Sequence, residues 1–256
     1  GTMSSDDDDD RTRIRPSAAS GPLSDPPPTA QDHGNGLPIG TRLAEFEITA
    51  LLGEGGFGIV YLARDTRLGR NVALKEYMPA NLATRGTNLT VSVRSERHRE
   101  TFELGLRSFV NEAKLLASFD HPSLVKVYRF WEENGTAYMV MQYYQGPTLK
   151  KYLGDLGGAP DERWILALLA PMIDALEQLH NDHCYHRDIA PDNILLLPLQ
   201  GTQAGASAAD TTVRPLLLDF GAARRVIGDM THALTVILKP GYAPIEQYAD
   251  SASMKQ

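Results

Sequence analysis

Three glycines, Gly53, Gly55 and Gly58, lie between two strand-like segments and limit the folds open to this chain more than any other feature. Their spacing, G-x-G-x-x-G, is also typical of dinucleotide-binding turns, so by itself it decides little. In a dinucleotide-binding fold the glycines lead directly into a helix. Here they lead into IVYLARD (59–65), which continues as a strand. The pattern therefore predicts a glycine-rich hairpin whose backbone N–H groups can approach phosphates.

The segments around this hairpin predict a strand-rich first half. Residues 46–65 and 70–78 are expected to form three antiparallel strands. A long polar connection should follow from Pro79 to about Glu100, and then a helix over 107–119, where apolar residues recur at helical spacing. Residues 124–144 predict a further hairpin, which turns at Asn134-Gly135.

The second half of the chain is expected to be mainly helical. Residues 162–180 are apolar along one face, and Pro171 within them should either kink one helix or separate two. The short segments 193–197 and 215–219 predict strands on either side of a mobile loop over 201–213.

Composition narrows the classes of function. Residues 1–38 are acidic and proline-rich and are expected to be disordered, beginning with what resembles a cloning remnant at Gly1-Thr2. The net charge of -7 argues against a general nucleic-acid binder. No apolar run predicts a membrane span, and no signal peptide opens the chain. A single cysteine, Cys184, excludes an internal disulfide framework and favours a reducing cytoplasm.

Two charged residues follow the glycines at suggestive positions. Lys75 lies in VALK on the third predicted strand, and Glu112 lies in the first predicted helix. Alone, the first could be an exposed strand lysine and the second a surface carboxylate. Together, a strand lysine and a helix glutamate form the pair that orients nucleotide phosphates.

Two further motifs supply acids and an amide. His186-Arg187-Asp188 is followed by Asn193, and Asp219-Phe220-Gly221 closes the last predicted strand. A carboxylate beside an acceptor hydroxyl can take its proton, while an amide oxygen and a second carboxylate can hold Mg²⁺ between phosphates. Chance would rarely supply the glycine loop, VALK, HRD-x-x-x-x-N and DFG in this order.

From Gly40 to Glu246 the chain resembles the eukaryotic-type protein kinase family, in particular its bacterial serine/threonine branch. DHPSLVKVYRFWEENGTAYMVMQYYQG (120–146) and KPGYAPIEQY (239–248) add to the resemblance. It implies an α+β, two-lobed protein kinase fold, with a five-stranded antiparallel N-lobe and its αC helix in residues 39–144. Residues 145–256 would form a partial, mainly helical C-lobe that is truncated after the activation segment.

The resemblance also implies a role for each site residue. Lys75 and Glu112 would form the activating ion pair, Asp188 would be the catalytic base, and Asn193 and Asp219 would bind Mg²⁺. The implied ATP contacts are the glycines, the gatekeeper Met141, the hinge residues Gln142 and Tyr144, and the packing residues Leu52, Val60, Ala73 and Leu195. Leu116, Val127, His186 and Phe220 would stack as an apolar spine, or could equally be plain core.

The catalytic loop departs from the family pattern at Ala190, where serine/threonine kinases carry a lysine that neutralises the transferring phosphoryl group. Tyrosine kinases also have alanine there but place an arginine two residues later, where this chain has Asp192. Lys239 replaces a threonine that normally touches the missing lysine. We hypothesise that Lys239 supplies the lost cation; the alternative is an exposed loop lysine.

The sequence therefore predicts an ATP- and Mg²⁺-dependent serine/threonine kinase that acts on protein hydroxyls in the cytoplasm, as such or as the cytoplasmic part of a membrane-anchored receptor. Thr235 and Thr231, in the expected activation loop, are candidates for phosphorylation, and self-association would allow autophosphorylation. A nucleotide-binding pseudokinase or partner-activated module is the alternative, and a small-molecule kinase a third. No contact with nucleic acid, or of this segment with a membrane, is expected.

Overall fold

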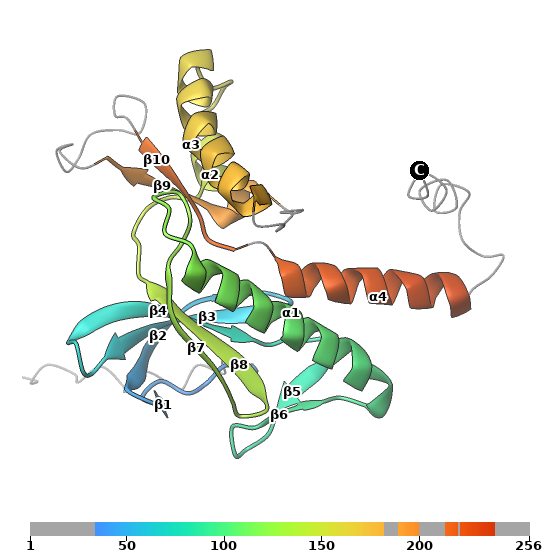
Figure 1. The fold of residues 1–256 in the computed structure, drawn as a ribbon. Helices are drawn as coiled ribbons and strands as arrows, with labels where there is room; N and C mark the ends of the chain where they lie inside the picture. Colours follow the sequence, from blue (N-terminus) through green and yellow to red (C-terminus); the bar gives the residue numbers. More distant parts are fainter. Residues whose placement is uncertain (1–33, 182–188, 200–212, 220, 239–256) are drawn as a thin grey trace, which may run out of the picture. The chain divides into compact units, whose positions relative to one another are not determined.

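The largest sheet of the protein is antiparallel and carries the five strands that the sequence predicts. The computed structural model describes residues 34–181, 189–199, 213–219 and 221–238, with the backbone alone from 232 to 238. A two-residue strand, β1, adds a sixth to the sheet at its edge. Neighbouring strands follow the order β1 (Arg42–Leu43), β2 (Phe46–Glu54), β3 (Gly58–Asp65), β4 (Arg70–Tyr77), β8 (Thr136–Gln142) and β7 (Val127–Glu133) (Figure 1).

The predicted turn between β7 and β8 is confirmed. Asn134 and Gly135 have φ angles of 56° and 71°, as a two-residue hairpin with the right-handed strand twist requires. Leu37, near the expected start of the ordered region, is buried, and its N–H donates a hydrogen bond to the hydroxyl of Tyr61.

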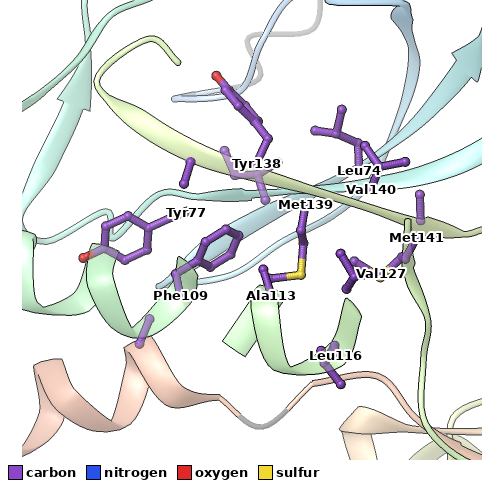
Figure 2. Packing of buried hydrophobic residues seen from close by; sticks show 14 of the residues in the cluster. Leu74, Tyr77, Phe109, Ala113, Leu116, Val127, Tyr138, Met139, Val140 and Met141 are labelled. Carbon is purple, nitrogen blue, oxygen red and sulfur yellow. The ribbon is translucent and has the colours of Figure 1, made fainter. Parts of the chain in front are cut away.

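The helix α1 (Arg99–Ser118) covers one face of this sheet (Figure 1). It packs against β7 and β8, and Figure 2 shows Phe109 and Ala113 of the helix beside Met139 of β8. Leu116 and Val127, two of the four predicted spine residues, belong to the same buried cluster. His186 and Phe220, the other two, lie outside the described residues.

Three helices, a 3-10 turn and one antiparallel pair of strands make up the described part of the second half. Thr148 caps α2 (Leu149–Asp155) by accepting a hydrogen bond from the N–H of Lys151. The helix α3 (Glu162–Asn181) runs through Pro171, so the proline does not separate two helices. The 3-10 turn η2 (Pro191–Asn193) leads into β9 (Ile194–Pro198), which pairs antiparallel with β10 (Val213–Leu217).

The expectation for residues 79–100 was wrong, because this segment contains secondary structure. It forms a hairpin of β5 (Ala83–Arg85) and β6 (Val91–Val93), followed by the 3-10 turn η1 (Glu96–His98). Ala83 and Val91 are buried, but strands of three residues are too short to show alternation in the sequence. The helix expected from 107 begins at Arg99.

The activation segment was expected to be a loop, and this too was wrong. Residues 222–238 form the helix α4 (Ala222–Leu238), which lies alongside α1 (Figure 1). Ala223 and Ile227, one helical turn apart, are buried in the main apolar cluster. Within the described ranges, no helix is both long and apolar enough to cross a bilayer.

Candidate functional site

One cavity of about 790 Å³ gathers the predicted nucleotide and metal contacts. Its walls come from the glycine loop between β2 and β3, from β4 and α1, from the segment after β8, and from the residues around Asp219. Its volume lies in the range of small-molecule sites. All predicted contacts within the described residues line it: Leu52, Gly53, Gly55, Gly58, Val60, Ala73, Lys75, Glu112, Met141, Gln142, Tyr144, Asn193, Leu195 and Asp219.

Lys75 and Asp219 form an ion pair in this cavity. Nζ of Lys75 lies 2.9 Å from Oδ2 of Asp219, and Oδ1 of Asp219 accepts a hydrogen bond of 3.0 Å from the N–H of Gly221. Burial opposes the charge of Lys75, but the carboxylates of Asp219 and Glu112 outweigh it and raise the pKa of Lys75. Burial likewise opposes ionisation of Asp219, yet the Lys75 ammonium lowers the pKa of Asp219. Both groups are therefore charged at neutral pH.

Glu112 has a different partner from the one that the resemblance implies. Its Oε2 accepts a hydrogen bond of 2.9 Å from the N–H of Ala222, the first residue of α4. A carboxylate at this position favours the helix start, where the backbone N–H groups carry partial positive charge. Among the described residues, the ion pair recorded for Lys75 joins it to Asp219. The activating pair Lys75–Glu112 stays a prediction for another arrangement of the site.

The glycine loop is tied to the segment that follows β4. The N–H groups of Met78 and Ala80 donate hydrogen bonds to the carbonyl oxygens of Phe57 and Gly56, at 3.1 and 3.0 Å. A side chain at Gly58 would bring a Cβ within 2.9 Å of the carbonyl oxygen of Glu76 on β4. Glycine is thus required at this position because the neighbouring strand passes so close.

The opposite end of the cavity is apolar. Ala73 of β4 and Met141 of β8 face each other across the ladder, and both are buried. Leu195 of β9 is buried as well, whereas Leu52 is 43% exposed at the rim. Burial raises the pKa of Tyr144 and so keeps its hydroxyl neutral. An apolar slot of this kind suits a flat aromatic ring.

Gly105 has no side chain and so leaves a notch in α1, into which Ile227 of α4 packs. Cδ1 of Ile227 lies 3.0 Å from the point where a Cβ of residue 105 would be, and the Tyr77 hydroxyl is closer still. That hydroxyl donates a hydrogen bond of 2.9 Å to the carbonyl oxygen of Phe102. The missing side chain at 105 thus allows α1, α4 and β4 to approach one another closely.

Gly105→Ala is therefore expected to lower the free energy of unfolding by about 1–3 kcal/mol, as overpacking does. It should also speed amide hydrogen exchange along α4, because the added methyl group displaces the side chain of Ile227. The control is Gly154→Ala in α2, where nothing lies within 4 Å of the added Cβ. That change should be neutral or slightly stabilising. Equal changes in the free energy of unfolding for the two substitutions would contradict the close packing at Gly105.

Several predicted residues fall outside this geometry. Asp188 and Lys239 lie outside the described residues, and Thr235 is described by its backbone alone, within α4. Thr231 is exposed on α4, and its hydroxyl donates a hydrogen bond of 2.8 Å to the carbonyl oxygen of Ile227. Asp192 and Arg224 also line the cavity and were not predicted as contacts. A pair of arginines directly after DFGAA was the signal for the second.

Comparison with known sequences gives matches over most of the chain. The family described as "Protein kinase domain" matches residues 46–252. Serine/threonine-protein kinase PrkC of Bacillus subtilis is 32% identical over 163 residues, which are 62% of this chain and 22% of that protein. Serine/threonine-protein kinase PknA of Nostoc sp. is 28% identical over 214 residues, or 80% of this chain and 33% of that protein. The chain thus spans a third or less of these relatives.

Among solved structures, the apo form of PpkA-294 is similar in both fold and sequence. Its TM-score is 0.67 at 50% sequence identity, and the match covers 84% of this chain and 72% of that chain. The match shows that the two proteins share a common architecture.

Proposed function

The chain belongs to the protein kinase family, and on this premise we propose that it transfers the γ-phosphate of ATP to serine or threonine hydroxyls of a protein. The observation that carries the proposal is the single cavity shared by the glycine loop, Lys75, Asn193 and Asp219. Glycine N–H groups and an ammonium are suited to phosphate oxygens, and the apolar end is suited to adenine.

The donor set of the cavity fits Mg²⁺. Asn193 and Asp219 line the same cavity and offer an amide oxygen and a carboxylate, the hard oxygen ligands that Mg²⁺ prefers. No cluster of three or more His, Cys, Asp or Glu that could hold a metal occurs in the described part of the chain. Mg²⁺ at phosphoryl-transfer sites takes one or two carboxylates, together with phosphate oxygens and water. Binding together with the nucleotide is therefore the mode proposed.

In the proposed reaction, ATP supplies the phosphoryl group and the protein supplies position and charge. Lys75 would hold the phosphates, and Asp188 would accept the proton of the substrate hydroxyl. That hydroxyl oxygen forms a bond to the γ-phosphorus, while the bond from the γ-phosphorus to the β–γ bridging oxygen breaks and ADP leaves. The role of Asp188 stays a prediction.

The described arrangement must change before Asp219 can serve the metal. Its two oxygens are engaged by Lys75 and by the N–H of Gly221. The proposal is that Lys75 exchanges Asp219 for Glu112 as the N–H of Ala222 withdraws from Glu112. Release of α4 from α1 would allow this exchange. Phosphorylation of Thr231 or Thr235 on α4 stays a candidate trigger.

The test is transfer of labelled γ-phosphate from ATP to the protein itself and to a mixture of serine- and threonine-containing peptides, with Mg²⁺ and with EDTA. Mg²⁺-dependent label on serine or threonine supports the proposal. Label on a small metabolite alone would support a small-molecule kinase instead. Binding of Mg²⁺-ATP with no transfer by a chain extended to the length of its relatives would contradict the kinase.

That last outcome would favour the second candidate, a nucleotide-binding pseudokinase or partner-activated module. The observation in its favour is the catalytic loop, where Ala190 stands in place of a cation and does not line the cavity, whereas the acidic Asp192 does. The protein substrate, its pathway and any self-association belong to the proposal as well. Thermal-shift binding measurements beside the transfer assay separate the two candidates.

A further inference from the structure

We propose that the guanidinium of Arg224, carried on the first turn of α4, binds the terminal phosphate of the nucleotide while α4 lies against α1. The inference rests on the proposed function, because it needs ATP in the cavity. It concerns the docked position of α4 that the structure describes. An arginine in this role would be specific for the third phosphate.

The place of Arg224 is fixed by its neighbours along the helix. Ala223 and Ile227 are 8% and 5% exposed and are packed in the main apolar cluster. The N–H of Ala222 donates to Glu112, and the N–H of Arg225 donates to the carbonyl oxygen of Gly221 at 3.0 Å. The first turn of α4 is thus held by Glu112 of α1 and by the apolar cluster, and Arg224 lines the cavity from this turn.

The charge of Arg224 reaches the two central groups of the site. It opposes the rise in the pKa of Lys75 and contributes to the lowering of the pKa of Asp219. Arg224, Lys75 and Asp219 line the same cavity, and the phosphates of a bound nucleotide would lie beside these charged groups. The glycine loop, whose N–H groups suit phosphates, lines the same cavity.

The balance of charge in the cavity calls for a second cation. A nucleoside triphosphate brings several negative charges, and Lys75 is shared with Asp219. Among the described residues that line the cavity, the basic side chains are Lys75 and Arg224. The acidic side chains are Glu54, Glu112, Asp192 and Asp219.

Arginine is well suited to binding a terminal phosphate. Its guanidinium presents several N–H donors in a planar fork and can hold two oxygens of one phosphate group, whereas a lysine acts as a point charge. Neighbouring Arg225 provides a contrast. Its Nε lies 3.7 Å from Oδ2 of Asp229, one turn further along α4, and it does not line the cavity.

The experiment compares the dissociation constants of Mg²⁺-ATP and Mg²⁺-ADP for the wild-type chain, Arg224→Gln and the control Arg225→Gln. Loss of a charged hydrogen bond predicts an ATP affinity about ten- to a hundredfold lower for Arg224→Gln. The ADP affinity should change much less, and Arg225→Gln should match the wild type with both nucleotides. Arg224→Lys should recover part of the lost ATP affinity, a result that damage to the helix would not give.

The assignment of Arg224 would be overturned by an unchanged ATP affinity in Arg224→Gln, by an equal loss of affinity for ATP and ADP, or by an equal loss in Arg225→Gln. A selective loss of ATP affinity in Lys239→Gln, without one in Arg224→Gln, would also overturn it and return the role to Lys239. If the wild-type chain binds neither nucleotide, the proposed function itself fails, so the two failures are distinguishable.

Discussion

Lys75→Ala is expected to lower the rate of phosphotransfer by about 100- to 1000-fold, the usual effect of removing one preorganised electrostatic group from an active site. Lys75 of β4 lines the cavity and contacts Asp219. Without it, the phosphates lose a cation and Asp219 loses its ion-pair partner. Initial rates of γ-phosphate transfer at saturating ATP, measured beside ATP affinity, would give the change.

The matched control for this prediction is Lys114→Ala, which removes an exposed lysine from α1. It should leave the rate within about twofold of the wild type, since surface substitutions away from a site have small effects. A Lys75→Ala chain that folds and turns over at the wild-type rate would remove the basis of the proposed mechanism.

Arg85→Ala is expected to lower the free energy of unfolding by about 3–5 kcal/mol, because it leaves a buried carboxylate without its cation. Glu76 of β4 is fully buried, and it pairs with Arg85 of β5, whose side chain is 6% exposed. Oε1 of Glu76 also accepts a hydrogen bond of 2.9 Å from the Tyr61 hydroxyl. Burial lowers the pKa of Arg85, but the charge of Glu76 outweighs it and raises that pKa.

Chemical denaturation of Arg85→Ala, of Glu76→Gln and of the double variant would measure the coupling between the two residues. The double variant should be less destabilised than the sum of the single ones, because neither charge is then left alone. The control is Arg42→Ala, which removes an ion pair with Glu47 whose side chains are 64% and 40% exposed. Its effect should stay below about 1 kcal/mol. An equally small effect for Arg85→Ala would contradict the buried pair.

The sequence was most informative where residue type and spacing are both demanded by chemistry. The glycine spacing followed by a strand excluded a dinucleotide fold, and Gly58 does lie against the carbonyl oxygen of Glu76 on the next strand. Lys75, Asn193 and Asp219, far apart along the chain, line one cavity as the order of motifs implied. The longer strands of the main sheet were predictable because each is a run of seven to nine residues, rich in strand-forming types and bounded by turn residues.

The misses have a common physical reason: they depend on contacts that no local pattern reveals. The β5–β6 hairpin has strands of three residues and lies against the β7–β8 turn, where the N–H of Val91 donates to the carbonyl oxygen of Asn134. The helix α4 was expected to be a loop by resemblance, although Ala223 and Ile227 have helical spacing. Ile227 packs against Gly105, which lies more than 100 positions earlier in the chain, so the contact leaves no local signal.

Two adjacent residues of strand β4 link different parts of the molecule. Lys75 extends from it toward the nucleotide cavity, whereas its neighbour Glu76 reaches Arg85, which in turn donates a hydrogen bond of 2.8 Å to the carbonyl oxygen of Asn35. A displacement of the backbone at Asn35 would therefore act, through Arg85 and Glu76, on the residue next to Lys75. The first described residues of the chain and Lys75 are thus connected through β4.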